Sequence, residues 1–208
     1  MSCKFVVGTG AALDWAVAAW REVAPDLEIR PLLLEPDANG GFNLALLDAL
    51  DASDDATAFV AGDEQFLNLP RAGLMGTLKS KGFAMPALIC RGAIISNTAT
   101  IGQNTFIGAG AIIGQGCQIG FNAVIGAGAN LGSGSQIGNS AWIGAGVVIG
   151  RSAKIAANVT LGTGVIVGDA IEIGKFCIID KPGKISANVT AKTFIHASYA
   201  NPMFIVGK

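Results

Sequence analysis

Two glycine-containing turns near the N-terminus have the residue types that bind phosphate. Gly8-Thr9-Gly10 follows one short apolar run, and Gly62-Asp63 follows another. Backbone N–H groups at such a turn, and at the start of the helix after it, can donate to phosphate oxygens. The first turn lacks the third glycine of a dinucleotide fingerprint, and no acidic residue stands at a convincing position on the second strand, so NAD binding is not expected. A plain tight turn explains Gly8-Thr9-Gly10 equally well.

Groups that bind metals or act as bases near neutral pH are scarce. The chain has one histidine, His196, and four cysteines without a CxxC pair. A γ-type carbonic anhydrase is excluded because its three-histidine zinc site cannot be built, and no metal is expected. His196 follows the last repeat described below, where a solvated tail imidazole is the simplest interpretation. A role as a base would require the groove of a neighbouring subunit within hydrogen-bonding reach.

Composition narrows the class of protein. The 208 residues are 51% hydrophobic and 14% charged, with a formal net charge of -1, which argues against disorder. This balance supports neither a nucleic-acid partner nor a polybasic membrane anchor. The sequence contains no run of about 18 apolar residues that would indicate a membrane helix. The N-terminus does not resemble a secretory signal. We therefore expect a cytoplasmic protein with no nucleic acid and no membrane among its partners.

Short apolar runs alternate with helical periodicity in the first 84 residues. Strands are predicted at 4–7, 29–34 and 57–60, and helices at 11–23, 43–50 and 70–80. This alternation predicts a small, Rossmann-like parallel sheet of three or four strands. Ligands of such sheets bind beyond the carboxyl ends of the strands, where both glycine turns fall.

A six-residue repeat dominates the second half. From Ile89 to Ile185 every sixth residue is aliphatic, seventeen times in succession, and the next residue is usually glycine. Three repeats make one coil of 18 residues, with the aliphatic side chain pointing inward and the glycine relieving the backbone at the corner. The pattern predicts a left-handed parallel β-helix of five to six coils over residues 85–190, followed by a tail at 191–208.

The residue before each aliphatic points outward and sorts into three faces. The first face carries Leu88, Phe106, Val124, Trp142, Thr160 and Ile178; the second carries Ile94, Ile112, Asn130, Val148, Ile166 and Lys184; the third carries Thr100, Gln118, Gln136, Lys154 and Glu172. Two faces are apolar and one is polar. The corner joining the apolar faces carries mostly small residues: Arg91, Ala109, Ala127, Ala145, Thr163 and Lys181. A threefold assembly would bury two faces and this corner, so a homotrimer is predicted.

The junction between the two halves resembles that of a known family. The segments Ala61-Gly62-Asp63-Glu64, Leu78-Lys79-Ser80-Lys81-Gly82-Phe83, Ala87-Leu88-Ile89 and Ala93-Ile94-Ile95-Ser96 are similar to the sialic acid O-acetyltransferase (NeuD) family and to PglD-like bacterial sugar acetyltransferases. The resemblance implies that residues 1–84 bind a nucleotide sugar and that neighbouring β-helices hold acetyl-CoA between them. Gly8, Thr9, Gly10, Gly62 and Asp63 would then contact the nucleotide sugar.

The chain departs from this family at the catalytic position. The family places a histidine two residues after an aliphatic repeat position near the middle of the helix, as general base, and here that residue is Ser133. Arg151 and Asp169 stack above it and could form a pair in the pocket, although pairing would weaken Asp169 as a base. Asn139, Arg151 and Lys175 are expected to border the donor groove, Asn139 and Lys175 because they share the corner between the polar face and an apolar face.

Two functions follow from these observations. The first is an acyltransferase, using acetyl-CoA on a nucleotide-activated sugar for surface polysaccharide or glycan biosynthesis, with an atypical active site. The second is a catalytically inactive relative that binds a sugar nucleotide or scaffolds a partner, which the missing histidine favours.

Overall fold

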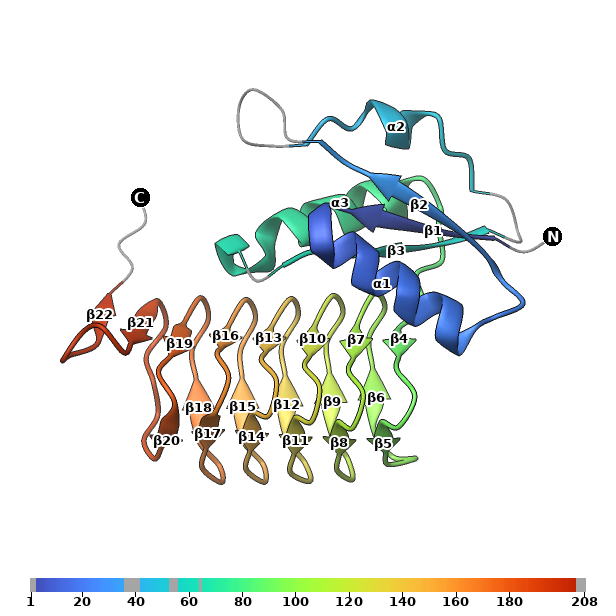
Figure 1. Cartoon of the computed structure of the whole chain (residues 1–208). Coiled ribbons are helices and arrows are strands. Elements are labelled where there is room, and N and C mark those ends of the chain that lie inside the picture. The colour runs from blue at the N-terminus through green and yellow to red at the C-terminus, as the bar shows by residue number, and fades with distance from the viewer. Residues whose placement is uncertain (1–2, 36–41, 53–55, 64, 205–208) are drawn as a thin grey trace.

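A small α/β domain sits on one side of a three-sided β-helix (Figure 1). The computed structural model describes residues 3–35, 42–52, 56–63 and 65–204. In the N-terminal domain, β1 (Cys3–Gly8), β2 (Glu28–Leu33) and β3 (Ala56–Val60) form a parallel sheet in the order β2-β1-β3. The connecting elements are α1 (Gly10–Val23), α2 (Ala45–Asp48), η1 (Gln65–Asn68) and α3 (Leu69–Ser80). The predicted small parallel sheet is confirmed, and α2 is shorter than the helix expected at 43–50.

Alternation along β1 and β3 directs apolar side chains to both faces of the sheet. Val6 and Phe59 pack with Trp20 of α1, whereas Val7 and Val60 lie in a separate cluster with Leu74 of α3. The two helices therefore cover opposite faces. No helix in the described part of the chain is both long and apolar enough to cross a membrane.

The repeat folds into a left-handed parallel β-helix of about six coils, as predicted. We name its three faces sheets I, II and III. Sheet I contains β4 (Leu88–Ile89), β7 (Phe106–Ile107), β10 (Val124–Ile125), β13 (Trp142–Ile143), β16 (Thr160–Leu161), β19 (Ile178–Asp180), β21 (Thr193–His196) and β22 (Met203–Phe204). Sheet II contains β5 (Ile94–Ile95), β8 (Ile112–Ile113), β11 (Asn130–Leu131), β14 (Val148–Ile149), β17 (Val165–Val167) and β20 (Gly183–Ile185). Sheet III contains β6 (Thr100–Ile101), β9 (Gln118–Ile119), β12 (Gln136–Ile137), β15 (Lys154–Ile155) and β18 (Glu172–Ile173).

Residues 18 positions apart lie in vertical columns. Val124 pairs with Trp142 on sheet I, Asn130 with Val148 on sheet II, and Gln136 with Lys154 on sheet III. The inward aliphatic and small side chains form one continuous buried core through the prism. After the last repeat, β21 pairs parallel with β19 and β22 pairs antiparallel with β21, so the segment beyond the repeat extends sheet I.

The sequence predicted that neighbouring subunits bury both apolar faces, sheets I and II, but the two sheets differ in what covers them. The N-terminal domain covers the first coils of sheet I: Leu88 and Val124 are buried, and the Phe106 ring lies 4.6 Å from that of Trp15 in α1. The expectation that a neighbouring subunit buries this whole face is wrong for these coils. An outward apolar column shows that a face is covered, but not by which surface. Sheet II stays open in the single chain, with Ile94 64% exposed.

Candidate functional site

The loops at the carboxyl ends of β1 and β3 touch each other. A Cβ at Gly8 would lie 2.8 Å from the Ala61 carbonyl oxygen, so only glycine allows this approach. Thr9 caps α1 in an extended conformation, and Gly10 opens the helix with φ +45°. No side chain caps the helix at Thr9, which leaves N–H groups of the first turn for another acceptor. The structure thus brings the predicted Gly8-Thr9-Gly10 turn beside Gly62 and the exposed Asp63; their contact with a nucleotide stays a prediction.

A buried arginine, Arg71 of α3, lies directly under the Gly62 loop. A Cβ at Gly62 would be 3.3 Å from the Arg71 Cδ. Its guanidinium donates to the carbonyl oxygens of Val60 (2.8 Å), Asn122 (2.7 Å) and Asn104 (2.6 Å), and the residue is only 3% exposed. Burial lowers the pKa of the guanidinium to about 9. Arg71 therefore ties the end of β3 to the β-helix.

Asparagine side chains at the corner between sheets III and I extend this connection. Asn104 Oδ1 accepts from the Val60 N–H (2.8 Å), and Asn104 Nδ2 donates to Asn122 Oδ1 (2.8 Å). Asn122 Nδ2 donates to Ser140 Oγ (3.0 Å), and Asn158 Nδ2 donates to the Leu67 carbonyl (2.9 Å). Four successive coils therefore hold the N-terminal domain through one edge, which we call the asparagine edge (Asn104, Asn122, Ser140 and Asn158).

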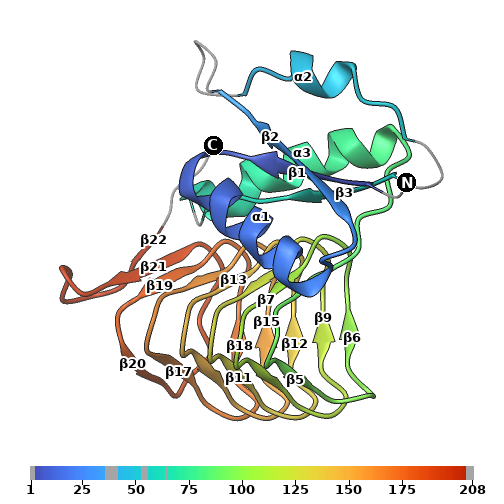
Figure 2. The same ribbon diagram turned by 45° about the vertical axis from the view of Figure 1, so that its right-hand side comes forward.

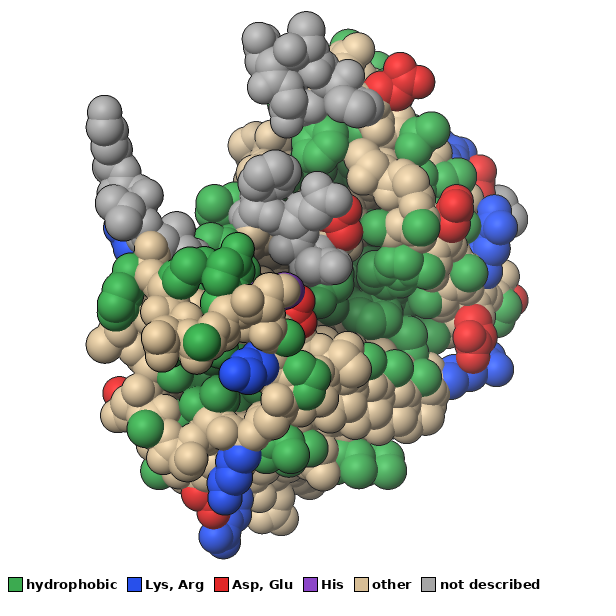
Figure 3. Space-filling view, turned by 60° about the vertical axis from the view of Figure 1, so that its left-hand side comes forward, with side chains coloured by type: hydrophobic (Ala, Val, Ile, Leu, Met, Phe, Trp, Pro, Cys, Tyr) green, Lys and Arg blue, Asp and Glu red, His purple; other side chains and the backbone are tan. Residues whose placement is uncertain are grey.

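A cleft of about 430 Å³ opens between the two domains. Leu67, just before α3, lies on one side, and the outward residues Trp142, Thr160 and Ile178 of sheet I lie on the other. Figure 3 shows a hollow between the domains with largely hydrophobic walls and with histidine and acidic side chains at its rim. Figures 1 and 2 place the start of α1 and η1 above this part of sheet I. The cleft therefore lies on the same side as the glycine turns.

The predicted catalytic position lies on a different edge, between sheets II and III. Ser133 is exposed there, and Arg151 and Asp169 follow it in the next two coils. Arg151 and Asp169 form an ion pair: Nη2 lies 2.9 Å from Oδ2, and the Arg151 backbone N–H donates to Oδ1 at 2.8 Å. The side-chain hydrogen bond from Arg151 lowers the pKa of Asp169 below its ordinary value. The carboxylate is thus a poor proton acceptor, and a catalytic role for these residues stays a prediction.

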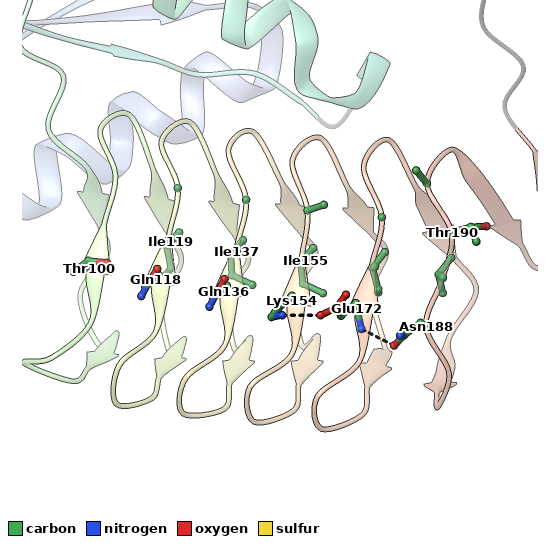
Figure 4. A pocket seen from close by; sticks show the side chains of 17 residues that line it. Thr100, Gln118, Ile119, Gln136, Ile137, Lys154, Ile155, Glu172, Asn188 and Thr190 are labelled. Atoms are coloured by element: carbon green, nitrogen blue, oxygen red, sulfur yellow. Dashed lines mark hydrogen bonds and ion pairs between the residues drawn. The ribbon is translucent and has the colours of Figure 1, made fainter.

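Sheet III forms the floor of a second groove, of about 800 Å³ (Figure 4). Gln118, Gln136, Lys154 and Glu172 project from it at successive coils, and Lys154 Nζ lies 2.7 Å from Glu172 Oε1. The predicted donor-groove residues flank this sheet without lining the groove. Arg151 lies on the edge before it, whereas Asn139 and Lys175 lie on the edge after it, where Asn139 Oδ1 accepts from the Phe121 N–H (3.2 Å). The structure therefore separates Arg151 from the other two across the width of sheet III.

Sequence reasoning missed several of the residues that join the two domains or lie near the cleft. Arg71 and Asn68 gave no signal by type, although both are buried. The asparagine edge did carry a signal, because Asn104, Asn122 and Asn158 stand where the other edges mostly have glycine. His196 was expected in a solvated tail, and the structure instead places it on β21 opposite Asp180. In the described residues no group of three or more His, Cys, Asp and Glu side chains is arranged to hold a metal ion.

Several solved structures of bacterial sugar acyltransferases have a fold similar to that of this chain. A histidine-to-alanine variant of GDP-perosamine N-acetyltransferase from Caulobacter crescentus matches with a TM-score of 0.81 and 19% identity, over 98% of this chain and 97% of that one. The acetyltransferase domain of PglB from Neisseria gonorrhoeae matches with a TM-score of 0.61 and 18% identity, over 96% and 99%. AntD, an N-acyltransferase from Bacillus cereus, matches with a TM-score of 0.52 and 16% identity, over 62% and 87%. At these identities the likeness concerns the fold.

A comparison with curated protein sequences finds no significant match. The family model described as the GMPPB C-terminal domain matches residues 83–195, which span the end of the junction, the repeats and most of β21. Because this match covers more than half of the chain, the protein belongs to the GMPPB C-terminal domain family.

Proposed function

We propose that this protein is an acyltransferase that moves the acetyl group of acetyl-CoA to the amino group of a nucleotide-activated sugar. One observation carries the proposal: the glycine turns at the carboxyl ends of β1 and β3 lie on the same side as a cleft whose floor is the β-helix. A nucleotide bound by N–H groups at the turns could direct its sugar into that cleft. Gly8, Thr9, Gly10, Gly62 and Asp63 are the proposed nucleotide contacts.

The ligands of the structural neighbours support the choice of substrates. The Caulobacter enzyme was crystallised with CoA and GDP-perosamine, and a variant of AntD with coenzyme A and dTDP-4-amino-4,6-dideoxyglucose. Both sugar nucleotides carry an amine. The narrower resemblance to the NeuD family would make the acceptor a hydroxyl, so the assay includes a nucleotide sugar whose amine is replaced by a hydroxyl. Four free cysteines agree with the reducing cytoplasm that we propose as the location.

We further propose a homotrimer built around the corner between sheets I and II. Ile94, Ile112, Val148 and Ile166 form an exposed apolar row on sheet II, and Ala109, Ala127 and Ala145 leave the adjoining corner small enough for close approach. Replacing Ile112 by Glu should convert a trimer to monomers in analytical ultracentrifugation, whereas Gln118→Glu on sheet III should leave the trimer intact. A wild-type monomer at micromolar concentration would refute the assembly.

Turnover of acetyl-CoA tests the enzymatic function directly. Thiol release would be measured with GDP-perosamine, dTDP-4-amino-4,6-dideoxyglucose and the hydroxyl analogue, with binding of each followed by isothermal titration. We expect release with at least one amino sugar and little with the hydroxyl analogue. The absence of histidine from every repeat corner favours the second candidate, a catalytically silent relative. Sugar-nucleotide binding without thiol release, or undetectable binding of acetyl-CoA, would select that candidate.

A further inference from the structure

One column of sheet I changes from glycine to ionisable residues at its far end. The residue after each outward–inward pair is a glycine in four successive coils, at Gly108, Gly126, Gly144 and Gly162. In the next coil the equivalent residue is Asp180, since Ile179 pairs with Leu161. The following strand, β21, places His196 opposite Asp180. The single imidazole of the chain therefore stands beside a carboxylate at the end of a glycine-lined column.

Asp180 is the one ionisable residue that lines the cleft between the domains, within the part of the chain that the structure describes. The preceding glycine makes room for it, because a Cβ at Gly162 would overlap the Asp180 Oδ1. Leu67, Trp142 and Ile178 supply apolar walls around the carboxylate.

Three contacts fix the His196 ring. It stacks on the Phe194 ring with an interplanar angle of 7°. The Tyr199 ring lies against it, with 6.1 Å between the His196 and Tyr199 ring centroids. The Ser198 backbone N–H donates to Nδ1 at 3.1 Å, so in the neutral ring the proton is on Nε2. Nε2 lies 3.8 Å from Asp180 Oδ2, just beyond hydrogen-bonding range. Catalytic contacts of this kind commonly shorten when a substrate closes the site.

We infer that Asp180 is the general base of acyl transfer and that His196 is its positioning residue. This inference rests on the proposed function. The amine attacks the thioester carbonyl, so that the C–N bond forms and the C–S bond breaks. The proton on the amine nitrogen passes to Asp180 Oδ1 and then to the sulfur of the leaving CoA, while the His196 Nε2–H donates to Oδ2 and holds the carboxylate in place. The products are the N-acetyl sugar and free CoA.

The edge that carries Ser133 offers a weaker base. Both oxygens of Asp169 already accept hydrogen bonds from Arg151, so neither is free to take a proton from a substrate. A serine hydroxyl without an adjacent base is a poor proton acceptor. Asp180, in contrast, lines the cleft, and His196 Nε2 lies 3.8 Å from its Oδ2.

Steady-state kinetics of Asp180→Asn and His196 variants test the inference on the full-length protein. Asp180→Asn should lower kcat on the order of 10²- to 10⁴-fold with little change in the KM for the nucleotide sugar, because the nucleotide contacts lie on other loops. His196→Ala should lower kcat roughly tenfold, and His196→Gln should restore part of it, since a Gln amide can donate from a position near Nε2. Both side chains are partly exposed, at 57% and 35%, so the variants should fold. Glu28→Gln is the matched control: it also removes an exposed carboxylate with a side-chain partner, at a site far from the cleft.

The outcomes separate this inference from the proposed function. Wild-type turnover with an unchanged kcat in Asp180→Asn would overturn the assignment of the base and leave the acyltransferase function standing. A large loss in Asp169→Asn, with none in Asp180→Asn, would move the base to the other edge. Equal kcat in His196→Gln and His196→Ala would remove the positioning role. No wild-type turnover with any acceptor would refute the proposed function, and the base with it.

Discussion

Two edges of the β-helix use different residue types at the corner position that has a positive φ. Each corner needs a residue with positive φ, and the edge between sheets I and II uses glycine in five successive coils: Gly92, Gly110, Gly128, Gly146 and Gly164. The asparagine edge has φ values of 54° to 58° at Asn104, Asn122, Ser140 and Asn158. A left-handed conformation costs an ordinary L-residue roughly 1–2 kcal/mol, and asparagine tolerates it better than most. The glycine edge is exposed, whereas the asparagine edge lies under the N-terminal domain.

The difference shows what a side chain adds at a strained corner. The left-handed residues of the asparagine edge expose carbonyl groups to Arg71 and Asn68, and their amides bond to one another and to Val60. The asparagine edge therefore both turns the chain and binds the N-terminal domain. The glycine edge can offer only backbone and close approach, which suits contact with a second copy of the chain.

The largest effect should come from removing Arg71. In Arg71→Met three buried carbonyls lose their charged donor, which should lower the free energy of unfolding by roughly 3 kcal/mol or more. Trp15 and Trp20 report on the N-terminal domain by fluorescence in urea, and hydrogen exchange at the Val60 amide reports on docking to Asn104. Arg21→Met, an exposed arginine on α1, is the control and should change stability by less than about 0.5 kcal/mol. Equal effects of the two variants would show that the asparagine edge does not depend on the buried cation.

A reciprocal exchange tests whether the asparagine side chains matter beyond their tolerance of positive φ. Asn122→Gly keeps the backbone but removes the bonds to Asn104 and Ser140, at a cost of roughly 1–3 kcal/mol. Gly128→Asn, on the opposite edge, has φ +66° and no atom within 4 Å of a new Cβ, so it should cost less than about 1 kcal/mol. Urea denaturation of both variants measures the difference. If Asn122→Gly caused no loss of stability, the asparagine side chain would contribute only its tolerance of positive φ.

The sequence predicted the β-helix well because its fold depends on a local period. Aliphatic residues six positions apart and columns 18 positions apart follow from one repeat, and the pairing of Val124 with Trp142 confirms the register. The small parallel sheet was predicted for the same reason, from alternating strand and helix patterns. These features need no knowledge of distant contacts.

The docking of the domains could not be predicted in this way. Phe106 belongs to an apolar column whether α1 or another subunit covers it. Lys4 begins a predicted strand, yet its ammonium is buried 4.0 Å above the Trp20 ring, where burial lowers its pKa to about 8. His196 lies only 16 residues beyond Asp180, so the 18-residue period did not place them together. Each of these positions depends on how two units pack, and packing leaves no periodic trace in the sequence.

The smallest effect should come from the exposed ion pair on the third edge, between sheets II and III. The hydrogen bond from Arg151 lowers the folded-state pKa of Asp169 below its ordinary value of 3.8. The unfolded chain therefore binds this proton more readily, and the stabilisation is present above about pH 4 and is lost as the pH falls through the folded-state pKa. Melting temperatures of wild type and Asp169→Asn, measured from pH 7 to pH 2, should differ slightly at neutral pH and converge in acid. Because the pair is exposed, 1 M salt should also reduce the difference in melting temperature at pH 7. A large difference that does not depend on salt would show that this pair stabilises the fold as strongly as the buried contacts of the asparagine edge.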